Sequence, residues 1–406
     1  MMTKHFPTPS DRMGFLWTLT SIEDCYVIEF GPAGTTHFAL EGAMELGGEH
    51  KMNVFTTHMS EVDITFGKHD KLAGAIREVD AEHRPKYIFV MASSISSLIG
   101  IDIDSICFEL QDEIAATLIP VTYGGYDGDY NLGIERALLT LCKTMVQDAK
   151  QDQGLYNIIG SNIDSYNFLS DKTEIKGILA DAFGLKLNTC FTAYTSVAEI
   201  ERAAKAGYNI VLRAEGLKAA EWMKTKFGIP FVYQKPYGIT GTLAWLKKTA
   251  ETFDLKVDMG CVTEKTEEVR RHLSEFKMFI RNAAHKNAVI YADYDTAAGL
   301  ADLLAELGLS CSHVFSKHAL PARAKEFVKA KPAESELKEA LGGGYYAAFG
   351  DDTLRKLCSD ESFFQVANPN MDKYNFYPHT PFVGFNGVLR LLQDLMNFER
   401  KKLKNK

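Results

Sequence analysis

The chain has 406 residues, of which 46% are hydrophobic, and 53 acidic against 45 basic side chains give a net charge of -8. At about 150 residues per domain, this length predicts two or three domains with large buried cores. The charges are well mixed apart from a basic C-terminal stretch, ERKKLKNK, which argues against nucleic-acid binding. No apolar run approaches the roughly 18 residues needed to span a bilayer, and the N-terminus has no signal-peptide pattern, so we expect a cytoplasmic protein without a membrane segment.

The seven cysteines are spaced at least 35 positions apart, which excludes a CxxC pair or a zinc-type spacing. We expect most of them to be small buried side chains in a reduced compartment.

Short apolar runs alternate with longer segments of helical periodicity along nearly the whole chain, a pattern typical of strand–helix units around parallel sheets. In the first part, helices are expected over Lys68–His83 and Asn131–Lys150. The expected strands there are Cys25–Phe30, Asn53–Thr57, Tyr87–Ala92 and Leu118–Thr122.

A polar break at Asp148–Gly154 separates this part from a second series of strands, and a charged helix over Thr263–His285 precedes a third. The second series is Leu155–Ile159, Leu185–Phe191, Tyr208–Leu212 and Pro230–Gln234. The third is Ala288–Tyr291, Ser310–Phe315, Tyr346–Phe349 and Phe363–Val366.

Three groups of about four units predict an α/β fold with three Rossmann-like, open parallel-sheet domains, because a closed barrel of eight units would leave four strands unplaced. The expected boundaries are 1–150, 151–260 and 261–374, with the C-terminal helix in 375–406 completing the first domain. Open sheets bind ligands beyond the carboxyl ends of their strands. Chemistry is therefore expected in the loops after Phe30, Ala92, Thr122, Gly160 and Ala292.

The loop in CYVIEFGPAGTTHFA is a poor phosphate cradle, because it lacks the lysine of such loops and Pro32 removes a backbone donor. Gly342–Gly344 more simply lets a loop turn. No GxGxxG motif follows a first strand, so dinucleotide binding has little support. Ser93–Ser97 reads as a helix cap, and no Ser–His–Asp or Cys–His set can be assembled from spacing.

Among the remaining polar residues, His37, His58 and His379 sit beside loops, and His58 reads as an ordinary surface residue. Asp127 and Asp129 read as solvated turn residues and not as an acid/base pair.

Taken together, the loops resemble the component 1 proteins of nitrogenases and their relatives, including dark-operative protochlorophyllide reductases and cofactor-assembly scaffolds. GPAGT is similar to the family's His-Gly-Pro-x-Gly-Cys turn, and FVMASSISSLIGIDI to its strand, cysteine and Ile-Gly-Asp-Asp-Ile. The other similar segments are VDITFG with Lys71-Leu72, IPVTYGGYDGDYNLG, FGIPFVYQKPYGITGTLAWL and HTPFVGFNGVLRLLQDLMN. The resemblance covers nearly the whole chain and implies three Rossmann-like domains around a central cleft.

The departures from the family pattern concern its cysteines. Thr35 and Ser94 stand where two cluster cysteines are expected, and the third position, near Pro9–Met13, has none. Soft thiolates are what hold Fe–S iron. Cys25 can be read as a displaced ligand or, as we prefer, as a core residue. Arg213 stands near the cysteine that holds the metal cofactor in nitrogenase α-subunits, and it can pair with Glu215 or face an anionic ligand.

The resemblance thus implies a site near the central cleft. Its expected catalytic residues are His37 and His379, and its expected cofactor-binding residues are Gly34, Thr35, Ser94, Tyr126 and Arg213. No metal ligand is assigned to this chain.

Two functional hypotheses follow. In the first, which we prefer, the chain is a subunit of a nitrogenase-like two-component reductase that receives low-potential electrons from an ATP-dependent iron–sulfur protein. A homologous subunit would complete a heterodimer or α2β2 assembly, and any 4Fe-4S cluster would be ligated mainly by that partner. In the second, the chain is a non-redox scaffold or binding protein for a metal-cofactor precursor, a tetrapyrrole or another small ligand.

Overall fold

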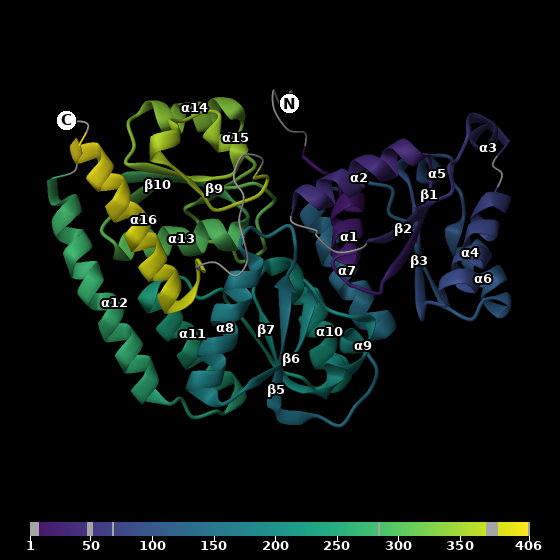
Figure 1. Cartoon of the computed structure of the whole chain (residues 1–406), viewed down its shortest axis with the longest axis horizontal. Coiled ribbons are helices and arrows are strands. Elements are labelled where there is room, and N and C mark those ends of the chain that lie inside the picture. The colour runs from purple at the N-terminus through teal and green to yellow at the C-terminus, as the bar shows by residue number, and fades with distance from the viewer. Residues whose placement is uncertain (1–7, 47–51, 67–68, 283–284, 371–380, 405–406) are drawn as a thin grey trace.

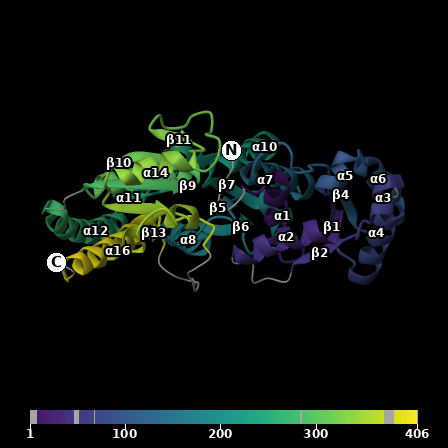
Figure 2. The same ribbon diagram turned by 90° about the horizontal axis from the view of Figure 1, so that it is seen from above.

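The computed structural model describes residues 8–46, 52–66, 69–282, 285–370 and 381–404. Within them the chain forms three separate parallel β-sheets flanked by helices, which confirms the expected α/β fold (Figure 1). The sheets follow one another along the long axis of the molecule, with the second in the middle (Figure 2). Each of the three expected segments contains one sheet.

The first sheet has the strand order β2-β1-β3-β4 and is parallel throughout. Pro120 lies in the outermost strand, where the missing N–H interrupts no inner ladder. The strands are β1 (Tyr26–Phe30), β2 (Asn53–Thr56), β3 (Tyr87–Ala92) and β4 (Thr117–Val121). The helices are α1 (Asp11–Thr20), α2 (Ala33–Glu45), α3 (Glu61–Phe66), α4 (Asp70–His83), α5 (Ser94–Leu98), α6 (Ile103–Leu110) and α7 (Tyr130–Met145).

The second sheet has the order β6-β5-β7-β8. Its strands are β5 (Asp152–Ser161), β6 (Lys186–Thr192), β7 (Ala206–Val211) and β8 (Phe231–Tyr233), and its helices are α8 (Phe168–Phe183), α9 (Val197–Glu201), α10 (Leu217–Phe227) and α11 (Gly238–Phe253).

The third sheet has the order β11-β10-β9-β12-β13. Its strands are β9 (Asn287–Ala292), β10 (Ser310–Ser316), β11 (Val328–Ala330), β12 (Ala347–Gly350) and β13 (Phe363–Gln365). The associated helices are α12 (Met259–Phe279), α13 (Tyr294–Glu306), α14 (Glu334–Gly342), α15 (Asp352–Arg355) and α16 (Gly384–Lys404).

The expected strands are all present with small shifts at their ends, and β11 was missed. This strand has three residues, of which Lys329 and Ala330 are exposed. A segment this short carries no alternation or apolar run, so its sequence resembles that of a loop.

The helices α1 and α7 approach each other more closely than side chains allow. A Cβ on Gly14 would lie 1.9 Å from the carbonyl oxygen of Tyr130, and one on Gly133 would lie 1.8 Å from that of Asp11. The two glycines therefore let the helix backbones touch. This contact holds α1, whose residues are all buried, against the helix that follows the first sheet.

The C-terminal helix α16 corrects one expectation. It packs against α8, α11 and α12, beside the second and third sheets, and does not complete the first domain (Figure 1). Its apolar stripe includes Leu391, Leu395 and Phe398, which join the core shared by those sheets. An amphipathic helix can bury such a stripe in any apolar groove, so its sequence does not specify which neighbour it covers.

No helix among the described residues combines the length and the apolar character that crossing a membrane requires.

Candidate functional site

A cavity of about 730 Å³ lies where the three sheet regions meet; we call it the central cavity. A volume of this size suits an organic ligand or a cofactor. The first region supplies its apolar wall, with Met13, Trp17, Phe38, Met44 and Leu46. The other regions supply a polar end, formed by Asp164, Lys317, His318, Asp351 and Asn368.

His318 is a deeply buried titratable group of that polar end, with 1% of its surface exposed. Its ring packs edge-on against Tyr130, with 4.5 Å between ring centroids. The Nδ1 atom lies 3.5 Å from Asp129 Oδ2, and Nε2 has no hydrogen-bond partner among the described residues. A buried ring nitrogen without a partner is positioned to exchange a proton with a bound ligand.

Asp129 holds His318 in place together with Lys331, whose Nζ lies 2.8 Å from the same carboxylate. Although burial raises the pKa of Asp129, the contacts with His318 and Lys331 outweigh it and hold this pKa below its ordinary value. The carboxylate is thus charged at neutral pH. The expectation that Asp129 is a solvated turn residue was wrong, because its side chain is 10% exposed, whereas Asp127 is largely exposed.

Lys317 lies beside His318 and forms a buried ion pair. Its Nζ is 2.7 Å from Asp351 Oδ2 and also donates to the carbonyl oxygen of Asn368. Burial alone would lower the pKa of Lys317, but the Asp351 carboxylate raises it above its ordinary value. The polar end of the cavity therefore carries a permanent cation whose charge is locally balanced.

Arg213 lies behind the cavity wall and is 3% exposed. Its Nη1 contacts both oxygens of Asp164 at 2.8 and 2.9 Å, and its Nε donates to Glu215 at 2.7 Å. The expected pair with Glu215 is present, and Asp164 is a partner that the sequence did not reveal. Because Arg213 is engaged by two carboxylates, it acts on the cavity by fixing Asp164, which lines it.

A further carboxylate, Asp295, adjoins this group from the third region. It accepts hydrogen bonds from Tyr233 Oη at 2.7 Å and from the Ala214 N–H at 2.8 Å. Burial, together with the nearby Glu215 carboxylate, raises the pKa of Asp295 to about 7. This site therefore gains or loses a proton near neutral pH.

A second cluster of polar groups lies at the carboxyl ends of β1, β3 and β4. Ser93 caps α5 as expected, accepting from the Ser96 N–H, and its own N–H donates to the carbonyl oxygen of Phe30. Ser94 Oγ donates to the Gly124 carbonyl at 2.7 Å, and Tyr126 Oη donates to the Ser94 carbonyl at 2.9 Å. The parallel sheet thus brings Ser94 and Tyr126 together, as expected of loops that follow neighbouring strands.

A family model described as "Nitrogenase component 1 type Oxidoreductase" matches residues 10–398. The chain belongs to this family.

Individual component 1 proteins resemble the chain at low identity. It is 32% identical over 241 residues to a nitrogenase iron-molybdenum cofactor biosynthesis protein, NifE, of Clostridium pasteurianum, a match that covers 57% of this chain and 51% of the relative. It is 24% identical over 315 residues to a subunit of the light-independent protochlorophyllide reductase of Nostoc punctiforme, covering 73% of this chain and 62% of that one. The chain thus matches about half to three fifths of the length of these relatives.

The fold agrees with that of a solved nitrogenase structure. A structure described as nitrogenase Cp1 at pH 6.5 superposes with a TM-score of 0.82 at 15% identity, covering 100% of this chain and 96% of that one. The similarity supports a shared arrangement of three sheets.

The residues at the positions where the resemblance placed the cluster cysteines do not fit an iron–sulfur cluster. Thr35 Oγ1 donates to the carbonyl oxygen of Pro32 at 2.9 Å, and the Ser94 hydroxyl is engaged as described above. Cys25 is buried before β1, where burial raises the pKa of its thiol, so it is a core residue. The described residues contain no group of three His, Cys, Asp or Glu that could hold a metal ion.

Two other residues expected at the site, Gly34 and His37, have no hydrogen bond to Ser94 or Tyr126 among the described residues. Gly34 lies exposed in the first turn of α2, with open space where a side chain would be. His37 is 75% exposed, and its Nε2 lies 3.1 Å from Glu41, which lines the central cavity. His379 lies outside the described residues. Catalytic roles for His37 and His379 stay predictions.

The sequence did not single out His318, Lys317 or Asp351. Asp164 and Asp295 follow Gly160 and Ala292, two loops in which chemistry was expected. His318 likewise follows the carboxyl end of a strand, β10. That position was the signal by which the sequence could have pointed to it.

Proposed function

We propose that the chain is one subunit of a nitrogenase-like two-component reductase, whose central cavity binds an organic substrate while a homologous partner subunit supplies the thiolates for any iron–sulfur cluster. The observation that carries this proposal is the cavity itself, with an apolar wall and a polar end that contains His318. Family membership supports reductive chemistry, and low-potential electrons would come from an ATP-dependent iron–sulfur protein.

The apolar wall accounts for the class of ligand. Trp17, Phe38 and Met44 offer apolar surface to a carbon skeleton. Binding is favoured because the apolar surfaces of the wall and of the ligand are both removed from water. Lys317 and Asp351 at the other end orient the polar groups of the substrate. An organic molecule with one polar end therefore fits better than a small inorganic substrate.

His318 supplies the proton that a reduction consumes. When electrons reach the bound substrate, the basic atom that develops takes a proton from Nε2 of His318. The Asp129 carboxylate, near Nδ1, stabilises the imidazolium before that transfer. Asp129 is thus a positioning residue, and His318 is the group that contacts the substrate.

The surface around Thr35 and Ser94 supports a partner subunit. Phe38, on the helix that carries Thr35, is 59% exposed, and Leu98, on the helix that carries Ser94, is 75% exposed. Tyr126, whose Oη donates to the Ser94 carbonyl, is 62% exposed. Large apolar side chains left exposed on the surface often mark a protein interface. Two relatives are themselves parts of larger assemblies, one a subunit of a protochlorophyllide reductase and the other the alpha chain of a nitrogenase molybdenum-iron protein from Methanosarcina barkeri.

A second candidate function is that of a non-redox scaffold or binding protein for a cofactor precursor, a tetrapyrrole or another small ligand. It is favoured by the hydroxyls of Thr35 and Ser94, which donate to backbone carbonyls and leave this chain without a cluster ligand at those positions. A scaffold would use the same cavity and would require no electrons.

Anaerobic co-purification with the proteins encoded beside its gene separates the two functions. The reductase predicts about four iron atoms per heterodimer with a paramagnetic signal after reduction. The iron should be lost when cysteines of the partner are replaced and kept in a Thr35→Val variant of this chain. A stable complex that contains no iron, with no iron–sulfur reductase component, would reject the reductase and support the scaffold.

A further inference from the structure

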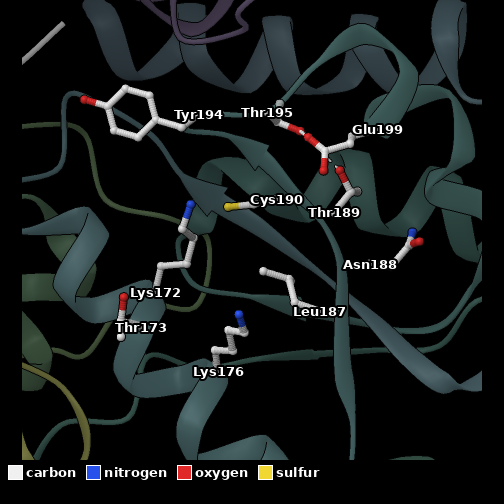
Figure 3. A pocket seen from close by; sticks show the side chains of 10 residues that line it. All are labelled: Lys172, Thr173, Lys176, Leu187, Asn188, Thr189, Cys190, Tyr194, Thr195 and Glu199. Atoms are coloured by element: carbon white, nitrogen blue, oxygen red, sulfur yellow. Dashed lines mark hydrogen bonds between the residues drawn. The ribbon is translucent and has the colours of Figure 1, made fainter. Parts of the chain in front are cut away.

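A second cavity, of about 290 Å³, lies in the middle region of the molecule, between α8 and β6 (Figure 3). It shares no lining residue with the central cavity. Two lysines of α8 line one side, and residues of β6 and of the segment that follows it line the other. Nothing in the proposed function uses this cavity.

The two lysines give the cavity a cationic side. Lys172 and Lys176 are one helical turn apart, and both side chains rise from α8 into the same space (Figure 3). Lys172 Nζ donates one hydrogen bond, to the Ala193 carbonyl at 3.2 Å, which leaves two of its protons free. Lys176 has no hydrogen-bond or ion-pair partner among the described residues. Like charges at this spacing repel each other, so an anion between them would be stabilising.

The carboxylate on the opposite side does not neutralise the lysines. Glu199 accepts from the Ser196 N–H at 3.0 Å and from Thr195 Oγ1 at 3.1 Å, and it pairs with Arg202 at 3.1 Å. These bonds fix it as part of the cap of α9. Its charge is balanced by Arg202, and the positive charge of the two lysines remains in excess.

The floor of the cavity adds donors for an oxyanion. Thr189 and Thr195 are both buried, and their hydroxyl oxygens lie 3.3 Å apart. Because Thr195 Oγ1 donates its proton to Glu199, the hydroxyl that can donate to an oxyanion is that of Thr189. The strand that carries Thr189 is the outermost of its sheet, so the N–H groups along its free side have no strand partner. Hydroxyls and backbone N–H groups together are typical oxyanion donors.

From this arrangement we propose that the cavity binds a small anion carrying a carboxylate or a phosphate group. Lys172 and Lys176 hold the charged oxygens, and Leu187 contacts the rest of the ligand. The site adjoins the junction with the first region, because the Tyr194 N–H donates to the Ser21 carbonyl and the Glu23 N–H donates to the Thr195 carbonyl. A bound anion therefore stabilises the contact between the first two sheet regions.

Isothermal titration of the full chain at constant ionic strength tests this proposal, with inorganic phosphate in one experiment and succinate in the other. We expect saturable binding of at least one of them, and the probe that binds identifies the oxyanion. Lys172→Gln with Lys176→Gln should weaken binding about tenfold or more, because two charge-assisted contacts are lost. Lys186→Gln, which removes one positive charge at the start of β6 outside the cavity and so matches Lys176→Gln alone, should bind like the unchanged chain.

Lys176→Gln alone keeps the experiment decisive, because Lys176 is exposed and its replacement removes no buried contact. This variant should also weaken binding. No saturable heat with either probe would overturn the proposal. Equal weakening in the Lys186→Gln control would do the same, because it would show a non-specific charge effect. Iron content and partner binding are not involved, so this test stands apart from that of the proposed function.

Discussion

Nδ1 of His318, in the third sheet region, lies 3.5 Å from Oδ2 of Asp129, in the first, at the polar end of the central cavity that His318 lines. This contact joins two parts of the chain that are separated by almost two hundred positions and bridges the regions that form the cavity wall. It explains why a histidine with a free Nε2 can stay buried there, since a charged carboxylate stabilises its ring.

We expect Asp129→Asn to lower the free energy of unfolding by about 1 to 3 kcal/mol at neutral pH, because His318 and Lys331 lose a buried charged acceptor. The folded-state pKa of Asp129 lies below the ordinary 3.8, so its contribution is present above that value and is lost as the pH falls through the lower one. The destabilisation caused by Asp129→Asn should therefore be smaller in acid than at neutral pH. Urea denaturation at pH 7 and pH 3.5 measures it. Asp148→Asn, at an exposed position, is the control and should change little.

The cavity predicts binding of an apolar anion such as 1-anilinonaphthalene-8-sulfonate. Met44→Asp places a negative charge on the apolar wall and should weaken this binding about tenfold, because the carboxylate repels the anionic probe and replaces apolar surface that the probe would cover. Met278→Asp makes the same change on α12, at a side chain that is likewise largely exposed and lies away from the cavity. Fluorescence titration compares them. Equal affinities in the two variants would show that the probe binds elsewhere.

Asp295 predicts a pH dependence of stability of opposite sign to that of Asp129. Its folded-state pKa is about 7, against 3.8 as the ordinary value, so the folded chain holds a proton that the unfolded chain releases. Stability should fall as the pH rises from about 4 to 7 and then level off. Between pH 5 and pH 7.5 the free energy of unfolding should fall by about 2 to 3 kcal/mol less in Asp295→Asn than in the unchanged chain. Chemical denaturation at the two pH values tests this, with Asp112→Asn, an exposed position, expected to behave like the unchanged chain.

Because α1 and α7 contact each other through Gly14 and Gly133, we expect that neither glycine tolerates an added methyl group. Gly14→Ala and Gly133→Ala should each destabilise the fold by more than about 3 kcal/mol, because the added Cβ meets a backbone carbonyl that cannot move aside. Gly74→Ala is the matched control in α4, where a Cβ meets nothing within 4 Å. It should stabilise the chain by about 0.5 to 1 kcal/mol. Denaturation midpoints, or soluble yield for variants that do not fold, decide between these outcomes.

The expected strands were found because each inner parallel strand is buried on both faces and leaves an unbroken apolar run. Tyr87–Ala92 is such a case, and its bounds agree with the sequence pattern. Positions beyond strand ends were predictable in the same way, which is why Ser94 and Tyr126 were expected to lie near each other. The contact partners of Ser94 were not predictable, because a hydroxyl binds whichever carbonyl the neighbouring loop presents.

By itself, the sequence determined the fold class, the order of the strands along the chain, the family resemblance and the absence of cysteines from the expected cluster positions. These properties depend on local periodicity and on residue identity. Tertiary structure alone decided that α16 covers the second and third sheets, that Arg213 is held by Asp164, and that His318 meets Asp129 at the central cavity. Such contacts join residues far apart in the chain, and their burial and charge exist only once the three sheets have packed together.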